Sequence, residues 1–122
     1  MNAESPIFTR TYDLLRWLLP LAQQLPRTHR SGLARQIPDT AFRLQRLLLR
    51  AARRPDMAIE LLQEADAALA ELRLLLRLAH DFKTISHGQY EEGARYTTEI
   101  GRLLGGWLRM AETKLSTARA PG

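Results

Sequence analysis

Leucine and alanine recur at spacings of three and four residues between positions 62 and 82. On a helix that turns about 100° per residue, these positions form one broad apolar face, which is typical of a helix packed on a core. A second apolar strip with Leu74 and Leu78 lies roughly opposite, and Arg73 and Arg77 lie between the two strips. A helix that is apolar on two sides is either buried between other elements or part of an assembly. The core face consists of Leu62, Ala65, Ala68, Leu69, Leu72, Leu75, Leu76, Ala79 and Phe82.

The same period predicts a helix from about residue 7 to residue 25. Besides its core face, this segment has a second apolar strip of Leu14, Trp17 and Leu21. Pro20 lies inside the pattern and predicts a bend near residues 16–17, because proline removes one helical hydrogen bond. The predicted core face consists of Phe8, Tyr12, Leu15, Leu18, Leu19 and Ala22.

The next helical segment starts near residues 28–31 and ends near residue 54. Pro38 lies in its first turns and predicts a break or kink, with Asp39 or Thr40 as the cap of a fresh start. Pro55 ends the segment, and Asp56 is the expected cap of the helix over residues 57–82. The predicted core face consists of Leu33, Ile37, Ala41, Leu44, Leu48 and Ala51.

The last predicted helix begins at Ser86-His87-Gly88-Gln89, a capping box in which glutamine follows three residues after the capping serine. The helix runs to about residue 114, and residues 116–122 are expected to fray. Its inward side is predicted to consist of Tyr90, Gly93, Ile100, Leu103, Leu104, Trp107 and Ala111.

Four amphipathic helices with short connections predict an all-α fold, an antiparallel up-down-up-down four-helix bundle. The length of 122 residues suits one domain, 1–122, with an ordered core over about 7–115. The second apolar strips would stay exposed on a lone bundle, so they predict a closed homo-oligomer. The predicted interface includes Leu14, Trp17, Leu21, Leu74 and Leu78.

Charge is unevenly distributed along the chain. Eighteen basic residues, 16 of them arginine, stand against 13 acidic ones and give a net charge of +5. Residues 27–54 carry a net charge of +7, whereas residues 55–81 carry −4. This asymmetry indicates an acidic partner, most often a nucleic acid.

Six arginines of the segment that ends near residue 54 fall within a sector of about 100°, opposite its core face. Asp39 is the only acidic residue there, and like charges four residues apart repel. A solvated face would normally mix both signs. We therefore expect these side chains to bind the backbone of a nucleic acid, with a solvated face and an acidic protein partner as the alternatives. The six are Arg35, Arg43, Arg46, Arg50, Arg53 and Arg54.

The last helix carries three further arginines at intervals of seven, which we assign to the same role. Beside them stand three glycines, each of which costs a helix about 1 kcal/mol relative to alanine. Close packing within the bundle and close approach by a second subunit or an RNA backbone explain the glycines equally well, and we assign Gly105 and Gly106 to the oligomer interface. The arginines are Arg95, Arg102 and Arg109, and the glycines are Gly101, Gly105 and Gly106.

Arg73 and Arg77 allow two interpretations. They could pair with Asp66 and Asp81 on the same helix, in which case they contribute little. They could instead contact a protein partner, because arginine beside surplus leucines is typical of interface hot spots.

The sequence holds no pattern typical of catalysis. Cysteine is absent, and the histidines at 29, 80 and 87 lack the Glu-x-x-His spacing of metal-binding bundles. No glycine-rich phosphate loop follows a strand. We expect no enzyme activity, no metal and no cofactor. With no signal peptide and no apolar run of membrane-spanning length, we also expect a cytoplasmic protein without a membrane partner.

Three segments resemble a known family: YDLLRWLLPLAQQLPR (12–27), EADAALAELRLLLRLAHDFKTIS (64–86) and QYEEGARYTTEIGRLLGGWLRM (89–110). Their most specific parts are the run EIGRLLGGW (99–107) and the two arginines of LRLLLR (72–77). They resemble the accessory variability determinant (Avd) proteins of diversity-generating retroelements, which belong with the ribosomal-RNA intervening-sequence four-helix-bundle proteins. The resemblance covers about residues 12–110.

This resemblance implies a four-helix bundle that assembles as a homopentameric barrel with a basic, nucleic-acid-binding surface. It implies two partners, the element's reverse transcriptase and its RNA (template and flanking spacer), with DNA as a further candidate. Family members help the polymerase copy template RNA with adenine-directed errors, which feeds mutagenic retrohoming in bacterial, archaeal or phage systems.

On this interpretation the chain is a non-enzymatic accessory subunit, and Arg73 and Arg77 contact the polymerase. The alternatives are a general RNA-binding bundle of the intervening-sequence type without a polymerase partner, and a protein-only scaffold.

Overall fold

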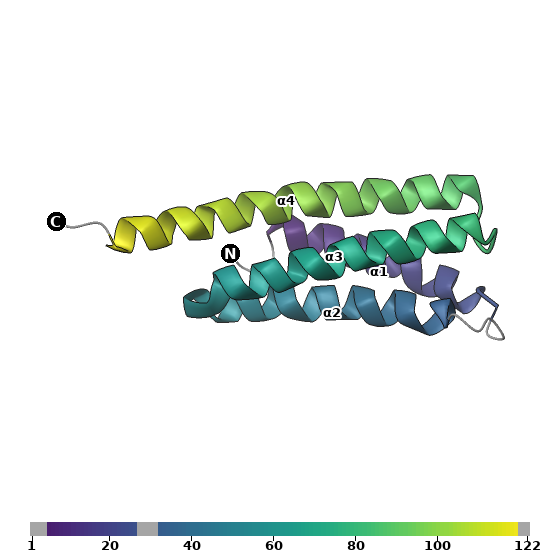
Figure 1. Ribbon diagram of the computed structural model, residues 1–122, viewed down its shortest axis with the longest axis horizontal. Helices are drawn as coiled ribbons and strands as arrows, with labels where there is room; N and C mark the ends of the chain where they lie inside the picture. The colour runs from purple at the N-terminus through teal and green to yellow at the C-terminus, as the bar shows by residue number, and fades with distance from the viewer. Residues whose placement is uncertain (1–4, 27–31, 120–122) are drawn as a thin grey trace.

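The computed structural model describes residues 5–26 and 32–119. Within these residues the chain is all-helical and contains no strand. Four α-helices and one 3-10 turn follow one another in the order shown in Figure 1. They are α1 (Pro6–Gln23), α2 (Leu33–Arg53), the turn η1 (Pro55–Met57), α3 (Ala58–Asp81) and α4 (His87–Arg119).

Each α-helix packs against two others. Contacts join α1 to α2, α2 to α3, α3 to α4 and α4 back to α1. The four helices therefore occupy the corners of a bundle, with α2 and α4 at opposite corners (Figure 1). At its carboxyl end α4 extends beyond the other helices.

The core is built from leucines and isoleucines of all four helices. Burying one such side chain contributes about 1.5–3 kcal/mol relative to leaving it exposed. The predicted core face of α2 is confirmed in full, and that of α3 in all but its last residue. Fully buried side chains include Leu14 and Leu18 of α1, Ile37, Leu44 and Leu48 of α2, Leu62, Leu69 and Leu72 of α3, and Ile100 and Leu104 of α4.

The inward side of α1 differs from the prediction. Tyr12 was expected in the core but is 61% exposed, whereas Leu14 and Leu21, expected to remain exposed on a lone bundle, are buried. The inward row is Ile7, Thr11, Leu14, Leu18 and Leu21. Thr11 fits this row because its hydroxyl donates a 2.7 Å hydrogen bond to the Ile7 carbonyl, and a hydrogen-bonded hydroxyl can be buried.

Phe82 is the second misplaced aromatic residue. It was expected on the core face of α3 but is about half exposed, because α3 ends at Asp81 and Phe82 already belongs to the turn. The expected bend at Pro20 stays a prediction, since α1 continues as a helix through that residue to Gln23.

Pro38 lies inside a continuous α2, so the predicted break is wrong, as are the fresh caps at Asp39 and Thr40. The alternative of a kink at Pro38 stays a prediction. Ile37 and Ala41 on either side are buried in the core. This packing holds the turn in helical form although position 38 donates no backbone hydrogen bond.

The start of α2 differs from the prediction as well. The helix begins at Leu33, and the capping residue Gly32 has a φ of 70°, a left-handed conformation that glycine adopts without strain. The predicted start at 28–31 lies outside the described residues.

Of the two predicted caps, one is present. Ser86 and Gln89 form the reciprocal capping box: the Ser86 N–H donates to Gln89 Oε1 (2.8 Å) and the Gln89 N–H donates to Ser86 Oγ (3.1 Å). Asp56 caps no helix, because it lies within η1 and no side chain caps α3. The last helix continues to Arg119, beyond its predicted end near residue 114.

Gly93 of α4 is required by packing between helices. A Cβ atom at this position would lie 3.1 Å from Cη2 of Trp17 and 3.2 Å from Cδ1 of Leu76, closer than ordinary van der Waals contact. At Gly106 in the same helix, an added Cβ would meet nothing within 4 Å. These two glycines therefore form a matched pair for mutation.

We predict that Gly93→Ala lowers the free energy of unfolding by about 1–3 kcal/mol, because overpacking forces Trp17 or Leu76 to shift. Gly106→Ala should raise it by up to about 1 kcal/mol, because alanine favours the helix and the site is open. Urea unfolding followed by circular dichroism measures both. Equal effects of the two substitutions would contradict the packing contact.

Candidate nucleic-acid interface

Six of the nine arginines that the sequence assigns to nucleic-acid binding lie in or next to α2, five on its outer side and Arg54 directly after its end. Every one is exposed, whereas Leu44 and Leu48 of the same helix are fully buried. The predicted division of this helix into an apolar inner side and a basic outer side is therefore confirmed. The six are Arg35, Arg43, Arg46, Arg50, Arg53 and Arg54.

Acidic residues from outside α2 neutralise two of these arginines. Arg43 forms an ion pair with Glu71 of α3. Arg54 donates two hydrogen bonds to Asp56 of η1, from Nε to Oδ1 (3.1 Å) and from Nη2 to Oδ2 (3.0 Å). The hydrogen bond raises the pKa of Arg54 and lowers that of Asp56. The charge count along 27–54 missed both pairs, because the acids lie further along the chain.

Three arginines of α2 remain without a partner in the described part of the chain. Arg46, Arg50 and Arg53 form no ion pair there. Their spacing of four and three residues places them on one side of the helix, and we call them the α2 arginine stripe. The remaining pair, Arg35 with Asp39, is 4.0 Å apart and largely exposed, so it neutralises little.

A shallow hollow of about 400 Å³ opens between α2 and α3 at one end of the stripe. Arg35, Arg43 and Arg46 contribute to its lining, together with Phe42 and Glu71. Guanidinium groups match the geometry of phosphate oxygens. Glu71 already engages Arg43, so Arg35 and Arg46 are the two guanidinium groups of this hollow that are left to contact a phosphate group.

A second hollow, of about 350 Å³, lies between α1 and α2. Exposed Tyr12 and Leu49 line it together with Phe8, Thr9, Thr11 and Gln45. Because the sequence pattern predicts Tyr12 in the core, it misses an exposed aromatic ring that lies beside α2. The sequence pattern places the polar Thr11 outside the core face and so assigns the wrong side of α1 to the core. Its hydrogen bond to the Ile7 carbonyl explains why Thr11 can face inward.

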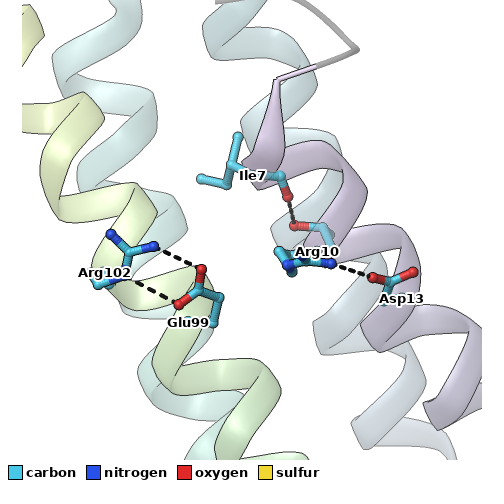
Figure 2. A network of polar contacts seen from close by, with 6 residues as sticks. Ile7, Arg10, Asp13, Glu99 and Arg102 are labelled. Atoms are coloured by element: carbon cyan, nitrogen blue, oxygen red, sulfur yellow. Dashed lines mark hydrogen bonds and ion pairs between the residues drawn. The ribbon is translucent and has the colours of Figure 1, made fainter.

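The arginines of α4 are exposed as well, but they lie on another side of the bundle. Arg95, Arg102 and Arg109 project from a helix that does not contact α2. Arg102 donates two hydrogen bonds to Glu99, from Nε to Oε2 (3.1 Å) and from Nη2 to Oε1 (2.8 Å; Figure 2). The nearby Arg10 of α1 forms its own pair with Asp13 (Figure 2).

The Arg102 hydrogen bond is the main reason why the pKa of Glu99 lies below its ordinary value, and it raises the pKa of Arg102. Arg95 contributes to a hollow with Arg10, Asp13 and Glu99, where both signs are mixed. Arg102 is thus paired with an acidic residue, whereas Arg95 and Arg109 form no ion pair in the described residues. The α4 arginines and the α2 arginine stripe do not form one surface.

Arg73 and Arg77 are exposed on α3. Neither forms an ion pair with Asp66 or Asp81 within the described residues, so the interpretation as local charge pairs is wrong. Nη2 of Arg73 instead donates a 3.2 Å hydrogen bond to Oγ1 of Thr98 on α4. This contact places Arg73 across the junction of α3 and α4.

Of the leucines assigned to an oligomer interface, Leu74 is the one that stays exposed, at 57%. Leu78 is half-buried and packs against the core. Trp17 is half-buried between Gly93 and Tyr96, with ring centres of Trp17 and Tyr96 5.6 Å apart. Of the apolar surface that the sequence predicts for the oligomer interface, the exposed part is therefore Leu74 on α3.

Packing within the chain does not account for Gly105 and Gly106. An added Cβ on Gly106 would meet nothing within 4 Å, and one on Gly105 would approach only the end of the Arg109 side chain, at 3.6 Å. A Cβ added at Gly101 would lie 3.4 Å from Cδ2 of Leu69, at the edge of ordinary van der Waals contact. The close packing offered as one explanation of these three glycines is found at Gly93 instead.

Over residues 5–26 and 32–119, no helix is long and apolar enough to cross a membrane. In the same ranges, no three histidine or acidic side chains converge in a way that could hold a metal ion.

Comparison with known protein families gives one match that spans most of the chain. A family described as bAvd-like matches residues 7–111, a range that extends from the first turn of α1 into the carboxyl-terminal part of α4. No match is found among curated proteins.

Proposed function

Because the chain belongs to the bAvd-like family, we propose that it is a non-enzymatic accessory subunit of a diversity-generating retroelement. In this role it binds the element's reverse transcriptase and its RNA and supports mutagenic synthesis of complementary DNA and retrohoming. Its compartment would be the cytoplasm of a bacterial, archaeal or phage-infected cell.

The observation that carries the RNA-binding part is the α2 arginine stripe. Arg46, Arg50 and Arg53 are exposed, lie on one side of a helix, and have no acidic partner in the described residues. Their mutual repulsion costs stability, and a polyphosphate backbone would reverse that cost. Contacts of this kind depend on charge and not on base sequence.

The exposed ring of Tyr12 favours RNA with unstacked bases as the ligand. Tyr12 lines the same hollow as Gln45 and Leu49. Gln45 directly precedes Arg46 in the sequence, and Leu49 directly precedes Arg50. Single-stranded nucleic acids are commonly bound by a basic track beside aromatic rings on which bases stack. We therefore place the RNA along the outer side of α2, toward α1.

We also propose the finer architecture that the family resemblance implies, an antiparallel up-down-up-down bundle that assembles as a pentameric ring or barrel. The short connections and the neighbour contacts of Figure 1 support the order of the helices. Exposed Leu74 and the open surface at Gly105 and Gly106 support an assembly through α3 and α4.

The proposed polymerase contact consists of Arg73 and Arg77. Both are exposed, and neither has an acidic partner in the described residues. Arginine is enriched among interface hot spots because its flat guanidinium group carries up to five hydrogen-bond donors.

We predict that replacing Arg46, Arg50 and Arg53 together by glutamine strongly weakens binding of a single-stranded RNA. The slope of log affinity against log salt should fall by about 2, at about 0.7 for each lost phosphate contact. Filter binding across a salt series measures both quantities, and circular dichroism should show unchanged helicity because all three side chains are exposed.

The matched control replaces Arg43, Arg54 and Arg102 by glutamine, which removes the same charge from arginines that already have acidic partners. Equal loss in both triple variants would mean that net charge alone drives binding. Absence of RNA binding by the wild-type protein even at low salt would favour a protein-only scaffold over an RNA-binding role.

We predict that the purified protein sediments at about five times the 13.9 kDa of one chain. Leu74→Glu should release monomers, because it places a charge in the proposed apolar contact. Leu115→Glu, at a comparably exposed leucine near the end of α4, is the control and should leave the assembly intact. A wild-type protein that is monomeric at micromolar concentration would contradict the ring.

We predict that replacing Arg73 and Arg77 by alanine sharply weakens capture of the cognate reverse transcriptase. Thermal stability and oligomeric state should change little, since exposed arginines contribute little to folding. A pull-down is run beside a melting curve and size-exclusion chromatography. Normal capture by the folded variant excludes the docking role, whereas loss of the oligomer would assign both arginines to the subunit interface.

A further inference from the structure

Two histidines face each other where α3 ends and α4 begins. Nε2 of His80 lies 3.3 Å from Nδ1 of His87, and the ring centres are 5.3 Å apart. His80 also stacks on Tyr90, with ring centres 4.7 Å apart and planes inclined by 19°. Two ring nitrogens from neighbouring helices therefore meet at one point of the surface.

The turn that joins the helices holds this geometry. His87 is the first residue of α4, directly after the capping serine of the Ser86–Gln89 capping box. On the other side, the Thr84 hydroxyl donates a 2.8 Å hydrogen bond to the carbonyl of Ala79, which precedes His80. Both imidazoles thus project from backbone that local hydrogen bonds fix.

Each histidine also has a carboxylate at its outer nitrogen. Nε2 of His87 lies 2.8 Å from Oε1 of Glu91, and Nδ1 of His80 lies 3.7 Å from Oδ1 of Asp81. A carboxylate at one ring nitrogen favours the tautomer that keeps the proton there. The 2.8 Å contact with Glu91 favours this tautomer for His87, so its inner Nδ1 presents a lone pair toward His80. Nε2 of His80 then either donates a hydrogen bond to that lone pair or, in the other tautomer, offers a second lone pair to a metal ion between the rings.

We propose that His80 and His87 bind a divalent transition-metal ion of the zinc class between Nε2 of His80 and Nδ1 of His87. Two Zn–N bonds of about 2.0–2.1 Å that meet at a tetrahedral angle separate their nitrogens by about 3.3–3.4 Å, which matches the distance between the two rings. Imidazole suits zinc, copper and nickel, whereas magnesium and calcium prefer oxygen ligands.

The carboxylates of Asp81 and Glu91 complete the arrangement. A metal-bound histidine commonly donates its second N–H to a carboxylate, which orients the ring and raises its basicity. No third histidine or acidic ligand converges on this point within the described residues, so water would fill the remaining coordination positions. With His87 70% exposed, both water and the ion reach the site directly.

None of the residues of this site belongs to the proposed RNA or polymerase contacts. The site also departs from the expectation of no metal. That expectation rests on the missing Glu-x-x-His spacing along a helix, a pattern that does not include two histidines on either side of a turn. The proposal rests on the local geometry alone and does not depend on the proposed function.

The test is calorimetric titration of the full chain with zinc chloride at pH 7.5. We expect one zinc ion per chain, an affinity that falls as protons compete for the ring nitrogens at pH 5.5, and no binding of magnesium chloride. His87→Gln should weaken zinc binding at least about tenfold. Glu91→Gln, which keeps both imidazoles, should weaken it about tenfold through the lost orientation.

His29→Gln is the matched control, because it removes the third histidine of the chain, which lies outside the described residues. It should leave zinc affinity unchanged, and circular dichroism without zinc should show that all variants remain helical. The proposal is overturned if wild-type protein binds no zinc up to millimolar concentration, if His87→Gln binds as tightly as wild type, or if His29→Gln abolishes binding.

Discussion

The structure depends on burying one apolar row from each of four helices at the same time. The row of α1, from Ile7 through Thr11 and Leu14 to Leu21, contacts both α2 and α4 and so closes the ring of helix contacts. Gly93 allows α4 to approach Trp17 and Leu76 at a distance that a larger residue would prevent. Once these rows are buried, the period of the helix leaves every arginine of α2 on the outside.

Packing between helices then decides which of those arginines keep their charge uncompensated. Glu71 reaches Arg43 from α3, and Asp56 reaches Arg54 from η1, so six basic positions reduce to a shorter stripe centred on Arg50. The basic segment 27–54 is thus partly neutralised by acidic side chains of the segment that follows it, 55–81. What remains is a narrow basic track, which suits a linear polyanion better than a broad charged face would.

The sequence predicted the fold class, the core sides of α2 and α3 and the capping box, because each follows from local period or local hydrogen bonding. It failed where tertiary contacts override a local preference. Thr11 has a polar side chain but faces the core, because the Ile7 carbonyl accepts its hydrogen bond. Pro38 stays helical because its neighbours are buried. The exposure of the six arginines in and directly after α2 was predictable. Their pairing with Glu71 and Asp56, and the meeting of His80 with His87, depend on which helices lie side by side.

Some features of the surface are not required by the single chain. Gly105 and Gly106 weaken α4 although no neighbour in the chain occupies the space that a side chain would fill. Leu74 exposes apolar area, and the α2 arginine stripe repels itself. Each of these features lowers the stability of the isolated protomer, and a bound partner would offset each loss. At α3 and α4 that partner would supply backbone or apolar surface, and at α2 it would supply phosphate groups. Positions at which a protomer is less stable than its fold allows are therefore the best guide to where this protein meets other molecules.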